Sequence, residues 1–188
     1  MRIVGGRLRG RPLAGPSSDA IRPTSDRLRE ALFNVLAHAY DDAVREARVI
    51  DLFAGTGALG IEAVSRGAAF ALLVDDDATA RGLIRENVER LGLGGSTRIF
   101  RRDATRLGPA AQNGSFSLLF CDPPYGRNLA GPALTSAAEG GWLEPGALAI
   151  VEERAGVFQL PAGFTELERR SAGESELTFA RFSRPSSS

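Results

Sequence analysis

The sequence predicts an α/β fold in which a mostly parallel sheet carries helices on both faces. Three observations support this prediction. Short apolar segments of strand length alternate with longer segments of helical periodicity. A glycine-rich loop follows the first strand, and a later apolar segment, FSLLF, runs into Cys-Asp-Pro-Pro-Tyr. Because such sheets bind ligands at the carboxyl ends of their strands, we expect both loops to lie at one edge.

The first long helix is expected in RPTSDRLREALFNVLAHAY, with Ser25 or Asp26 as its N-cap. Apolar residues recur there at intervals of three and four, which predicts one buried face. That face consists of Leu28, Ala31, Leu32, Val35, Leu36 and Ala39.

The later elements follow in alternation. Strands are expected at 48–52, 70–74, 97–100, 117–121 and 147–152, and helices at 58–66, 78–91 and 129–139. The segments FTELERRS and SELTFARF alternate in polarity around Ala172-Gly173-Glu174, which predicts a C-terminal antiparallel hairpin. Together the strands make a sheet of seven.

Length and composition limit the class of protein. The 188 residues suit one domain, and 43% apolar with 24% charged residues is typical of a globular chain. No apolar segment approaches the roughly 20 residues of a membrane span. The arginine-rich start is unlike a secretory signal, and the single cysteine, Cys121, fits a reducing compartment. We therefore expect a cytoplasmic protein.

The net charge of zero conceals an excess of basic residues at the start of the chain. The first 30 residues carry a net charge of +4 and the remainder −4. The basic residues of this segment are Arg2, Arg7, Arg9, Arg11, Arg22, Arg27 and Arg29. Apolar residues separate them as in a short hairpin: Ile3, Val4, Leu8 and Leu13. Clustered arginine indicates contact with phosphate, as in a nucleic acid.

The stretch VIDLFAGTGALGIEA contains Gly-x-Gly-x-x-Gly at Gly55, Gly57 and Gly60, between an expected strand and an expected helix. Asp75 ends the next strand, 20 residues after Gly55. This spacing matches the fingerprint of dinucleotide-binding folds, in which the acid accepts ribose hydroxyls. The loop therefore predicts a cofactor that carries adenosine.

Three carboxylates favour S-adenosylmethionine over a nicotinamide dinucleotide. Asp51 lies at a strand end before the first glycine, where it could meet an ammonium group but would repel a pyrophosphate. Asp103 ends the third strand and could accept the adenine amino group. The third is Asp122, at the end of the fourth strand.

The stretch Asp122-Pro123-Pro124-Tyr125 suits methyl transfer to an amine on a planar base. Such a nitrogen is a weak nucleophile because its lone pair is delocalised. A carboxylate at Asp122 and the carbonyl of Pro123 could accept its two N–H bonds and direct the lone pair at the methyl group. The prolines fix the backbone, and Tyr125 offers a face for base stacking.

The chain resembles a known family in these motifs. DLFAGTGALG with DPPY resembles class I S-adenosylmethionine-dependent amino-methyltransferases of Rossmann-like fold. MRIVGGRLRGRPL followed by RPTSDRLREALFN resembles the N-terminal signature of the RsmD family, which methylates the N2 amine of a guanine in 16S ribosomal RNA. In one departure, Asp75 stands where that family generally has glutamate, so the ribose contact would shift.

The resemblance implies that different segments of the chain have different functions. Residues 1–24 form a basic RNA-binding arm, 25–183 the methyltransferase domain and 184–188 a disordered tail. The catalytic residues are Asp122, Pro123, Pro124 and Tyr125. The cofactor residues are Asp51, Phe53, Gly55, Gly57, Asp75, Asp103 and Asp122. The RNA-binding residues are Arg2, Arg7, Arg9, Arg11, Arg22, Thr24 and Arg27.

The expected partner is 16S rRNA within the small ribosomal subunit or an assembly intermediate, bound by a monomer that uses no metal and no membrane. Three alternatives remain open on the residues alone. An amino-methyltransferase of DNA adenine or protein glutamine would use a similar loop. A nicotinamide-dependent oxidoreductase would use the glycine fingerprint, and an RNA-binding module would need no Asp122.

Overall fold

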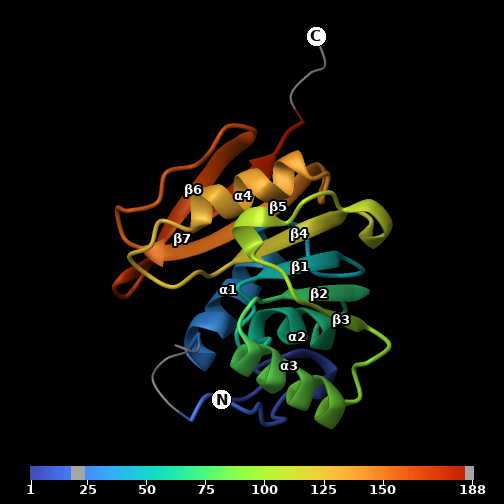
Figure 1. Cartoon of the computed structure of the whole chain (residues 1–188). Helices are drawn as coiled ribbons and strands as arrows, with labels where there is room; N and C mark the ends of the chain where they lie inside the picture. Colours follow the sequence, from blue (N-terminus) through green and yellow to red (C-terminus); the bar gives the residue numbers. More distant parts are fainter. Residues whose placement is uncertain (18–23, 185–188) are drawn as a thin grey trace.

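The computed structural model describes residues 1–17 and 24–184. Their seven strands form one sheet in the order β3-β2-β1-β4-β5-β7-β6 (Figure 1). The strands are β1 (Arg48–Leu52), β2 (Phe70–Val74), β3 (Thr97–Phe100), β4 (Phe116–Cys121), β5 (Leu143–Arg154), β6 (Phe164–Ala172) and β7 (Ser175–Phe182). The helices are α1 (Asp26–Ala39), α2 (Ala58–Ser65), α3 (Ala78–Leu91) and α4 (Ala130–Glu139).

The pairing of the strands confirms the predicted fold class. Strands β1 to β5 run parallel to one another, and β7 pairs antiparallel with both β5 and β6. Strand β5 is longer than the sequence predicts because Leu143 already pairs with Phe116 ahead of an irregularity in the register. The chain reverses at Gly173 and Glu174, so the C-terminal hairpin is also confirmed.

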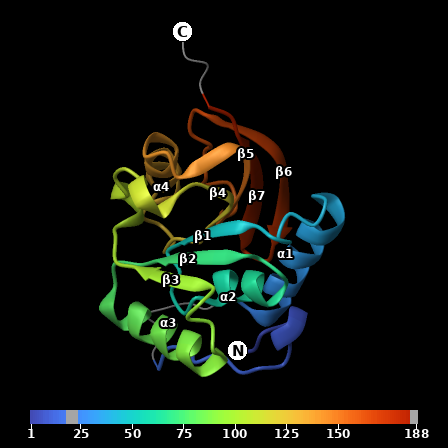
Figure 2. The ribbon, with the colours of Figure 1, turned by 90° about the vertical axis from the view of Figure 1, so that its right-hand side faces the viewer.

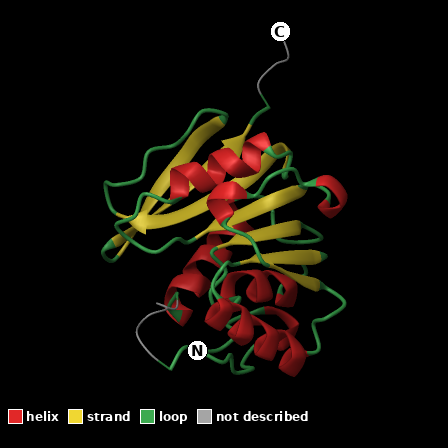
Figure 3. Ribbon diagram, viewed as in Figure 1, coloured by secondary structure: helices red, strands yellow, loops and turns green. Residues whose placement is uncertain are grey.

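Helices cover both faces of the sheet (Figures 2 and 3). Residues of α1, α2, α3 and the N-terminal arm pack into one apolar cluster, while α4 packs into a second cluster on the opposite face. Alternate residues of β1 separate accordingly, with Val49 in the first cluster and Ile50 in the second. The central parallel strands are therefore buried on both faces, as parallel sheets are, whereas the edge strand β6 has no buried residue.

The buried face of α1 differs from the predicted one. Ser25 caps the helix by accepting a hydrogen bond from Leu28, as expected. However, Ala31 and Ala39 are exposed. The residues buried on α1 are Arg29, Leu32, Phe33 and Leu36. The prediction is thus confirmed at Leu32 and Leu36, while Leu28 and Val35 are partly buried against the core. It was wrong at Ala31 and Ala39, and it did not foresee that a paired arginine would be buried on this helix.

The N-terminal arm folds as the short hairpin that its apolar residues predict. Ile3 N donates to Arg11 O at 2.9 Å, and Leu13 N donates to Met1 O at 2.9 Å. Ile3, Leu8 and Leu13 are buried in the same cluster as α1 and α2. The described part of the arm, residues 1–17, thus contributes to the core of the domain. A role of residues 1–24 in RNA binding stays a prediction.

Two buried polar side chains fasten the arm to the sheet domain. Asn87 on α3 accepts a hydrogen bond from Ala14 N at 2.7 Å, and its Nδ2 donates to Ala14 O and to Thr56 O. Glu62 on α2 accepts from Val4 N at 3.0 Å. Asn87 therefore holds both the arm, at Ala14, and the glycine loop, at Thr56.

Glu62 is also the centre of a buried ion cluster. Its Oε2 lies 3.2 Å from Nη1 of Arg29, and its Oε1 lies 2.8 Å from Nε of Arg66. The side chains of Glu62 and Arg29 have no exposed area. Arg29 additionally donates to Arg2 O at 2.8 Å. Two arginines therefore compensate the buried carboxylate and join α1, α2 and the arm.

Replacing Arg29 with alanine should lower the free energy of unfolding by roughly 3 kcal/mol, because removing one partner of a buried pair leaves the other charge poorly compensated. Arg90→Ala is the matched control, since Arg90 forms an exposed pair with Glu86 and such pairs contribute about 1 kcal/mol or less. Denaturant unfolding measures both. Equal losses in the two variants would show that the buried cluster adds nothing beyond an ordinary surface pair.

Candidate functional site

A cavity of about 550 Å³ opens where the parallel strands end. Nine of the ten residues predicted for catalysis and cofactor binding line it. They are Asp51, Phe53, Gly55, Asp75, Asp103, Asp122, Pro123, Pro124 and Tyr125. The tenth, Gly57, does not line the cavity. The strand ends thus bring together side chains that are up to 74 positions apart in the sequence.

The glycine loop turns sharply from β1 into α2. Phe53 adopts a φ of 58°, and Gly57 adopts a φ of 82° as the N-cap of α2. A Cβ on Gly57 would lie 3.1 Å from Cδ1 of Ile61, so this glycine faces helix α2 and not the cavity. Its role is to allow the turn from the loop into the helix. Gly60 permits close packing on β2, because a Cβ there would lie 2.3 Å from Leu73 Cδ2.

Asp51, the penultimate residue of β1, is a buried carboxyl group. Its Oδ2 accepts a hydrogen bond from Gly60 N at 3.0 Å. Burial raises the pKa of Asp51 to about 7, against the lowering effect of that hydrogen bond, and the charge of Asp75 raises it further. The carboxyl group therefore titrates near neutral pH, and a cation placed beside it would favour the ionised form.

Asp75, at the end of β2, is tied to the glycine loop. Its Oδ2 accepts from Gly55 N at 2.9 Å, and its Oδ1 accepts from Asp77 N at 3.0 Å. Burial raises the pKa of Asp75, while these two bonds lower it. A carboxylate has about four acceptor positions, so capacity for ligand hydroxyls remains. The short side chain reaches the loop directly.

Asp103 follows β3, and its pKa is lowered, whereas the pKa values of Asp51 and Asp75 are raised. Its Oδ1 accepts from both Oγ1 and N of Thr105, at 2.7 and 2.9 Å. These bonds, with the charges of Arg106 and Arg127, lower the pKa of Asp103. The group is thus held as a carboxylate at the rim of the cavity, where it can accept hydrogen bonds from a ligand amine.

The Asp122 loop begins where β4 ends. Asp122 N donates to Leu52 O at 3.5 Å, and Oδ2 of Asp122 accepts a hydrogen bond from Oγ1 of Thr24 at 2.8 Å. Pro123 is buried, and Pro124 is exposed. Thr24 also lines the cavity. The structure therefore places Thr24, which the sequence assigned to RNA, against a predicted catalytic carboxylate.

Tyr125 is held at both its hydroxyl and its ring. The hydroxyl donates to Oε1 of Glu152 at 3.1 Å, and this oxygen also accepts from Ser175 Oγ at 3.2 Å. The guanidinium of Arg154 lies 5.7 Å from the ring centroid, within the range of a cation–π contact. Buried Glu152 lines the cavity as well. The ring is therefore fixed in place beside Asp122 without support from any ligand.

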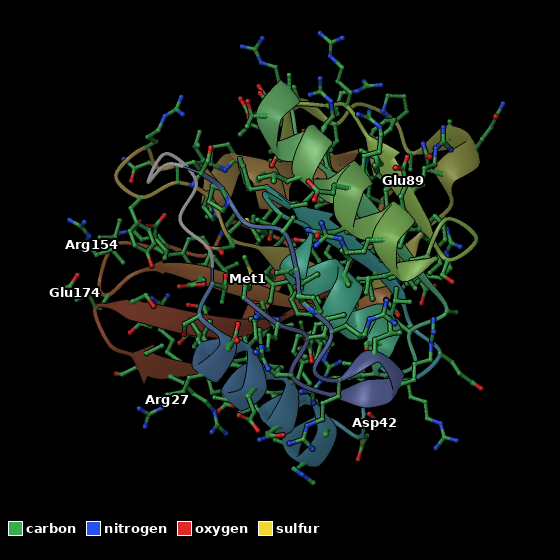
Figure 4. All side chains as sticks on the ribbon, turned by 90° about the horizontal axis from the view of Figure 1, so that it is seen from below. Met1, Arg27, Asp42, Glu89, Arg154 and Glu174 are labelled. Carbon is green, nitrogen blue, oxygen red and sulfur yellow. The ribbon has the colours of Figure 1, made fainter. Side chains whose placement is uncertain are left out.

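Of the predicted RNA-binding arginines, those that the structure describes lie outside the cavity. Those on the described part of the chain are exposed: Arg2, Arg7, Arg9, Arg11 and Arg27. Arg22 lies outside the described residues. In the view from below, Arg27 and Arg154 project from the same edge, the left one in Figure 4, and Met1 lies near the centre of the face.

The cavity itself is strongly acidic. Of the residues described, seven acidic side chains and one arginine line it. The acids are Asp51, Asp75, Asp76, Asp77, Asp103, Asp122 and Glu152. Such a lining suits a ligand with positive charge, hydroxyls and amino groups, and it opposes the two negative charges of a pyrophosphate. Within the described ranges, 1–17 and 24–184, no group of side chains is arranged to hold a metal ion.

Sequence reasoning missed Glu152 and Arg127, which also line the cavity. The rule that ligands bind at strand ends could have found Glu152, because it lies near the end of β5. Arg127 follows the Asp122 loop by two positions. No local pattern pointed to Glu62, whose importance comes only from its partners in the folded chain.

Comparisons with known proteins cover nearly the whole chain. The family model described as Conserved hypothetical protein 95 matches residues 1–181. Ribosomal RNA small subunit methyltransferase D of Escherichia coli strain K12 is 37% identical over 177 residues, covering 93% of this chain and 86% of that protein. The protein of the same name in Haemophilus influenzae is 33% identical over 176 residues, covering 92% and 89%.

Solved structures agree with the observed fold. The structure of yhhF from Escherichia coli has a TM-score of 0.84 at 34% identity and covers 98% of this chain and 99% of its own. A hypothetical protein of Thermus thermophilus has a TM-score of 0.75 at 38% identity, covering 95% and 98%. At this coverage the likeness extends over the arm, the glycine loop and the Asp122 loop.

The raised pKa of Asp51 predicts a pH dependence of stability. Between about pH 4 and pH 7, the unfolded chain has Asp51 ionised while the folded chain keeps it protonated. Folding then takes up a proton, so stability falls as pH rises, by about 1.4 kcal/mol per pH unit from this group. Asp51→Asn should remove this slope between pH 5 and pH 7.

Urea unfolding at several pH values measures the difference between the two proteins. Glu139→Gln is the control, because Glu139 is an exposed carboxylate that does not line the cavity. An Asp51→Asn variant with the same slope as the wild type would mean that Asp51 is already ionised in the folded state.

Proposed function

The chain belongs to the RsmD family, whose model is described as Conserved hypothetical protein 95, and we propose that it methylates the N2 amine of a guanine in 16S ribosomal RNA, with S-adenosylmethionine as donor. The methyltransferase class rests on relatives at 33 to 37% identity. One observation carries the assignment to this site: the Asp122 loop and the glycine loop line the same cavity.

The residues of the cavity fit S-adenosylmethionine. The buried carboxyl of Asp51 suits the ammonium group, Asp75 the ribose hydroxyls and Asp103 the adenine amine, while Phe53 supplies apolar contact. When bound, this cofactor would supply a methyl group from its sulfonium. The electron pair of the broken S–C bond would stay on sulfur, the nitrogen lone pair would form the new N–C bond, and one amine proton would pass to solvent. The acidic lining also favours a ligand of net positive charge.

Asp122 and the carbonyl of Pro123 have the chemistry to accept the two N–H bonds of the substrate amine. Two such acceptors on one nitrogen favour a pyramidal geometry, which frees the lone pair for attack. The tethered ring of Tyr125 can stack on the base. Guanine in an RNA hairpin loop is accessible to such a site because it can turn out without opening a duplex.

The exposed arginines of the arm support an RNA substrate, since they neutralise phosphates without occupying the cavity. The names of the E. coli and H. influenzae relatives support ribosomal RNA of the small subunit over DNA adenine or protein glutamine. The acidic cavity argues against a nicotinamide dinucleotide. We extend the proposal to a cytoplasmic monomer acting on the small subunit or an assembly intermediate.

The direct test offers labelled S-adenosylmethionine and the purified protein to small-subunit particles, naked 16S rRNA, DNA and a protein fraction. The proposal expects label in the RNA of the particles, recovered as N2-methylguanosine by mass spectrometry. Label in DNA or protein instead, or a different nucleoside, would reject it. None of the described helices is long and apolar enough to cross a membrane.

Substitutions of Asp122 and Asp75 should have opposite effects. Asp122→Ala should lower the rate of methyl transfer roughly a hundredfold, because a positioned group at a reacting centre is lost, with little change in cofactor affinity. Asp75→Ala should weaken cofactor binding, with the rate largely restored at saturating cofactor, because Asp75 meets only the ribose. Single-turnover rates and equilibrium binding measure the two effects.

Each variant controls for the other. If Asp122→Ala bound the cofactor far more weakly yet turned over normally at saturation, Asp122 would belong to the cofactor site alone. An unchanged dissociation constant in Asp75→Ala would remove Asp75 from that site.

Exposed arginines of the arm should set the salt dependence of RNA binding. Deleting the arm would also delete core residues, so single substitutions of Arg7, Arg9 and Arg11 to glutamine are the cleaner test. Each lost phosphate contact should reduce the slope of log affinity against log salt by about 0.7 to 0.9. Arg98→Gln is the control, because Arg98 is an exposed arginine on the edge strand β3 and not part of the arm, and cofactor affinity reports on folding. Slopes equal to that of the control in all three variants would refute the role of the arm.

A further inference from the structure

Thr24 occupies an unexpected place for a residue of a basic arm. Its hydroxyl donates to Oδ2 of Asp122 at 2.8 Å, although the two residues are 98 positions apart. Both side chains line the cavity. A hydroxyl that only supported the arm would not need to meet the carboxylate that follows β4.

The backbone around Thr24 is anchored by buried charge. Thr24 O accepts a hydrogen bond from Nε of Arg29 at 3.5 Å, and Arg29 is fully buried against Glu62. Ser25, the next residue, caps α1, and Asp26 pairs with Arg29. The position of Thr24 is therefore set by the start of a helix and by an ion cluster in the core, independently of the Asp122 loop.

A hydrogen bond from a fixed hydroxyl restricts the rotation of a carboxylate. Asp122 follows the last residue of β4, and its backbone N donates a long hydrogen bond to Leu52 O at 3.5 Å. The Thr24 hydroxyl adds a restraint on the side chain, from a distant segment of the chain. It also favours the charged form of the carboxylate, as donated hydrogen bonds do.

We propose that Thr24 is a positioning residue for methyl transfer, whose hydroxyl holds the Asp122 carboxylate in the orientation that meets the substrate amine. This inference rests on the proposed function. It replaces the prediction that Thr24 contacts RNA, and it makes the junction between the arm and α1 a part of the active site. The hydroxyl forms no bond to the substrate and takes no proton from it.

The test compares Thr24→Val, which keeps the shape and loses the hydroxyl, with Thr24→Ser, which keeps the hydroxyl. Thr24→Val should lower kcat roughly tenfold or more, because small misplacements at a reacting centre cost that much. The KM for small-subunit particles and the Kd for S-adenosylmethionine should stay within about twofold. Thr24→Ser should retain kcat within about threefold.

A merely structural role would leave kcat and its pH profile unchanged in a folded variant. The proposal expects the acid limb of the kcat profile to lie at higher pH in Thr24→Val than in the wild type, because the carboxylate loses a hydrogen bond from the Thr24 hydroxyl. Ser25→Ala is the matched control. It weakens the cap of the same helix but keeps the Thr24 hydroxyl, so kcat and its pH profile should not change.

The outcomes separate the possible roles. A higher KM for particles with unchanged kcat would assign Thr24 to RNA binding, and a higher kcat would show that the hydroxyl competes with the substrate for Asp122; either overturns the inference. If Thr24→Val does not fold, Thr24→Ala replaces it and the same criteria apply. A wild-type protein that methylates no small-subunit RNA refutes the proposed function itself, whereas an active wild type with a fully active Thr24→Val refutes only the role of Thr24.

Discussion

The close approach of α2 to the sheet at Gly60 is the constraint on which the site depends. A Cβ at this position would overlap Leu73 and lie 3.3 Å from Oδ2 of Asp51. Because glycine has no Cβ, α2 packs close to the sheet and Gly60 N donates a hydrogen bond to Asp51. The glycine loop then lies beside β2, where Gly55 N donates to Asp75. The same helix presents Glu62 to Arg29 and to the arm. The packing of Gly60 against Leu73 thus helps to position both the glycine loop of the cavity and the N-terminal arm.

Charge is separated in space on this framework. Acidic groups at the strand ends line the cavity, while the described arginines of the arm remain exposed. On the proposed function, a cofactor of net positive charge would meet the acidic cavity, and the phosphates of an RNA would meet the exposed arginines. The net charge of zero is the balance of +4 over the first 30 residues and −4 over the remainder, and it does not reflect a neutral surface.

Local patterns predicted what depends on local sequence. The strands and the helix bounds follow from periodicity, and the carboxylates at the ends of β1, β2 and β4 follow from the rule that parallel strands end together. Contacts between distant segments were not predictable in this way. The burial of Arg29 depends on its pairing with Glu62, and no spacing in the sequence links Thr24 to Asp122. The apolar residues of the arm predicted the hairpin, but they did not predict that it packs into the core of the domain.

The central claim is that the cavity beside Asp122 methylates a guanine amine of small-subunit ribosomal RNA. The most direct measurement is mass spectrometry of 16S rRNA from cells that lack the protein, complemented with the wild type or with Asp122→Ala. The account predicts that one N2-methylguanine is lost, that the wild type restores it, and that Asp122→Ala does not. An unchanged set of methylated guanines in the deletion strain, or full restoration by Asp122→Ala, would contradict it.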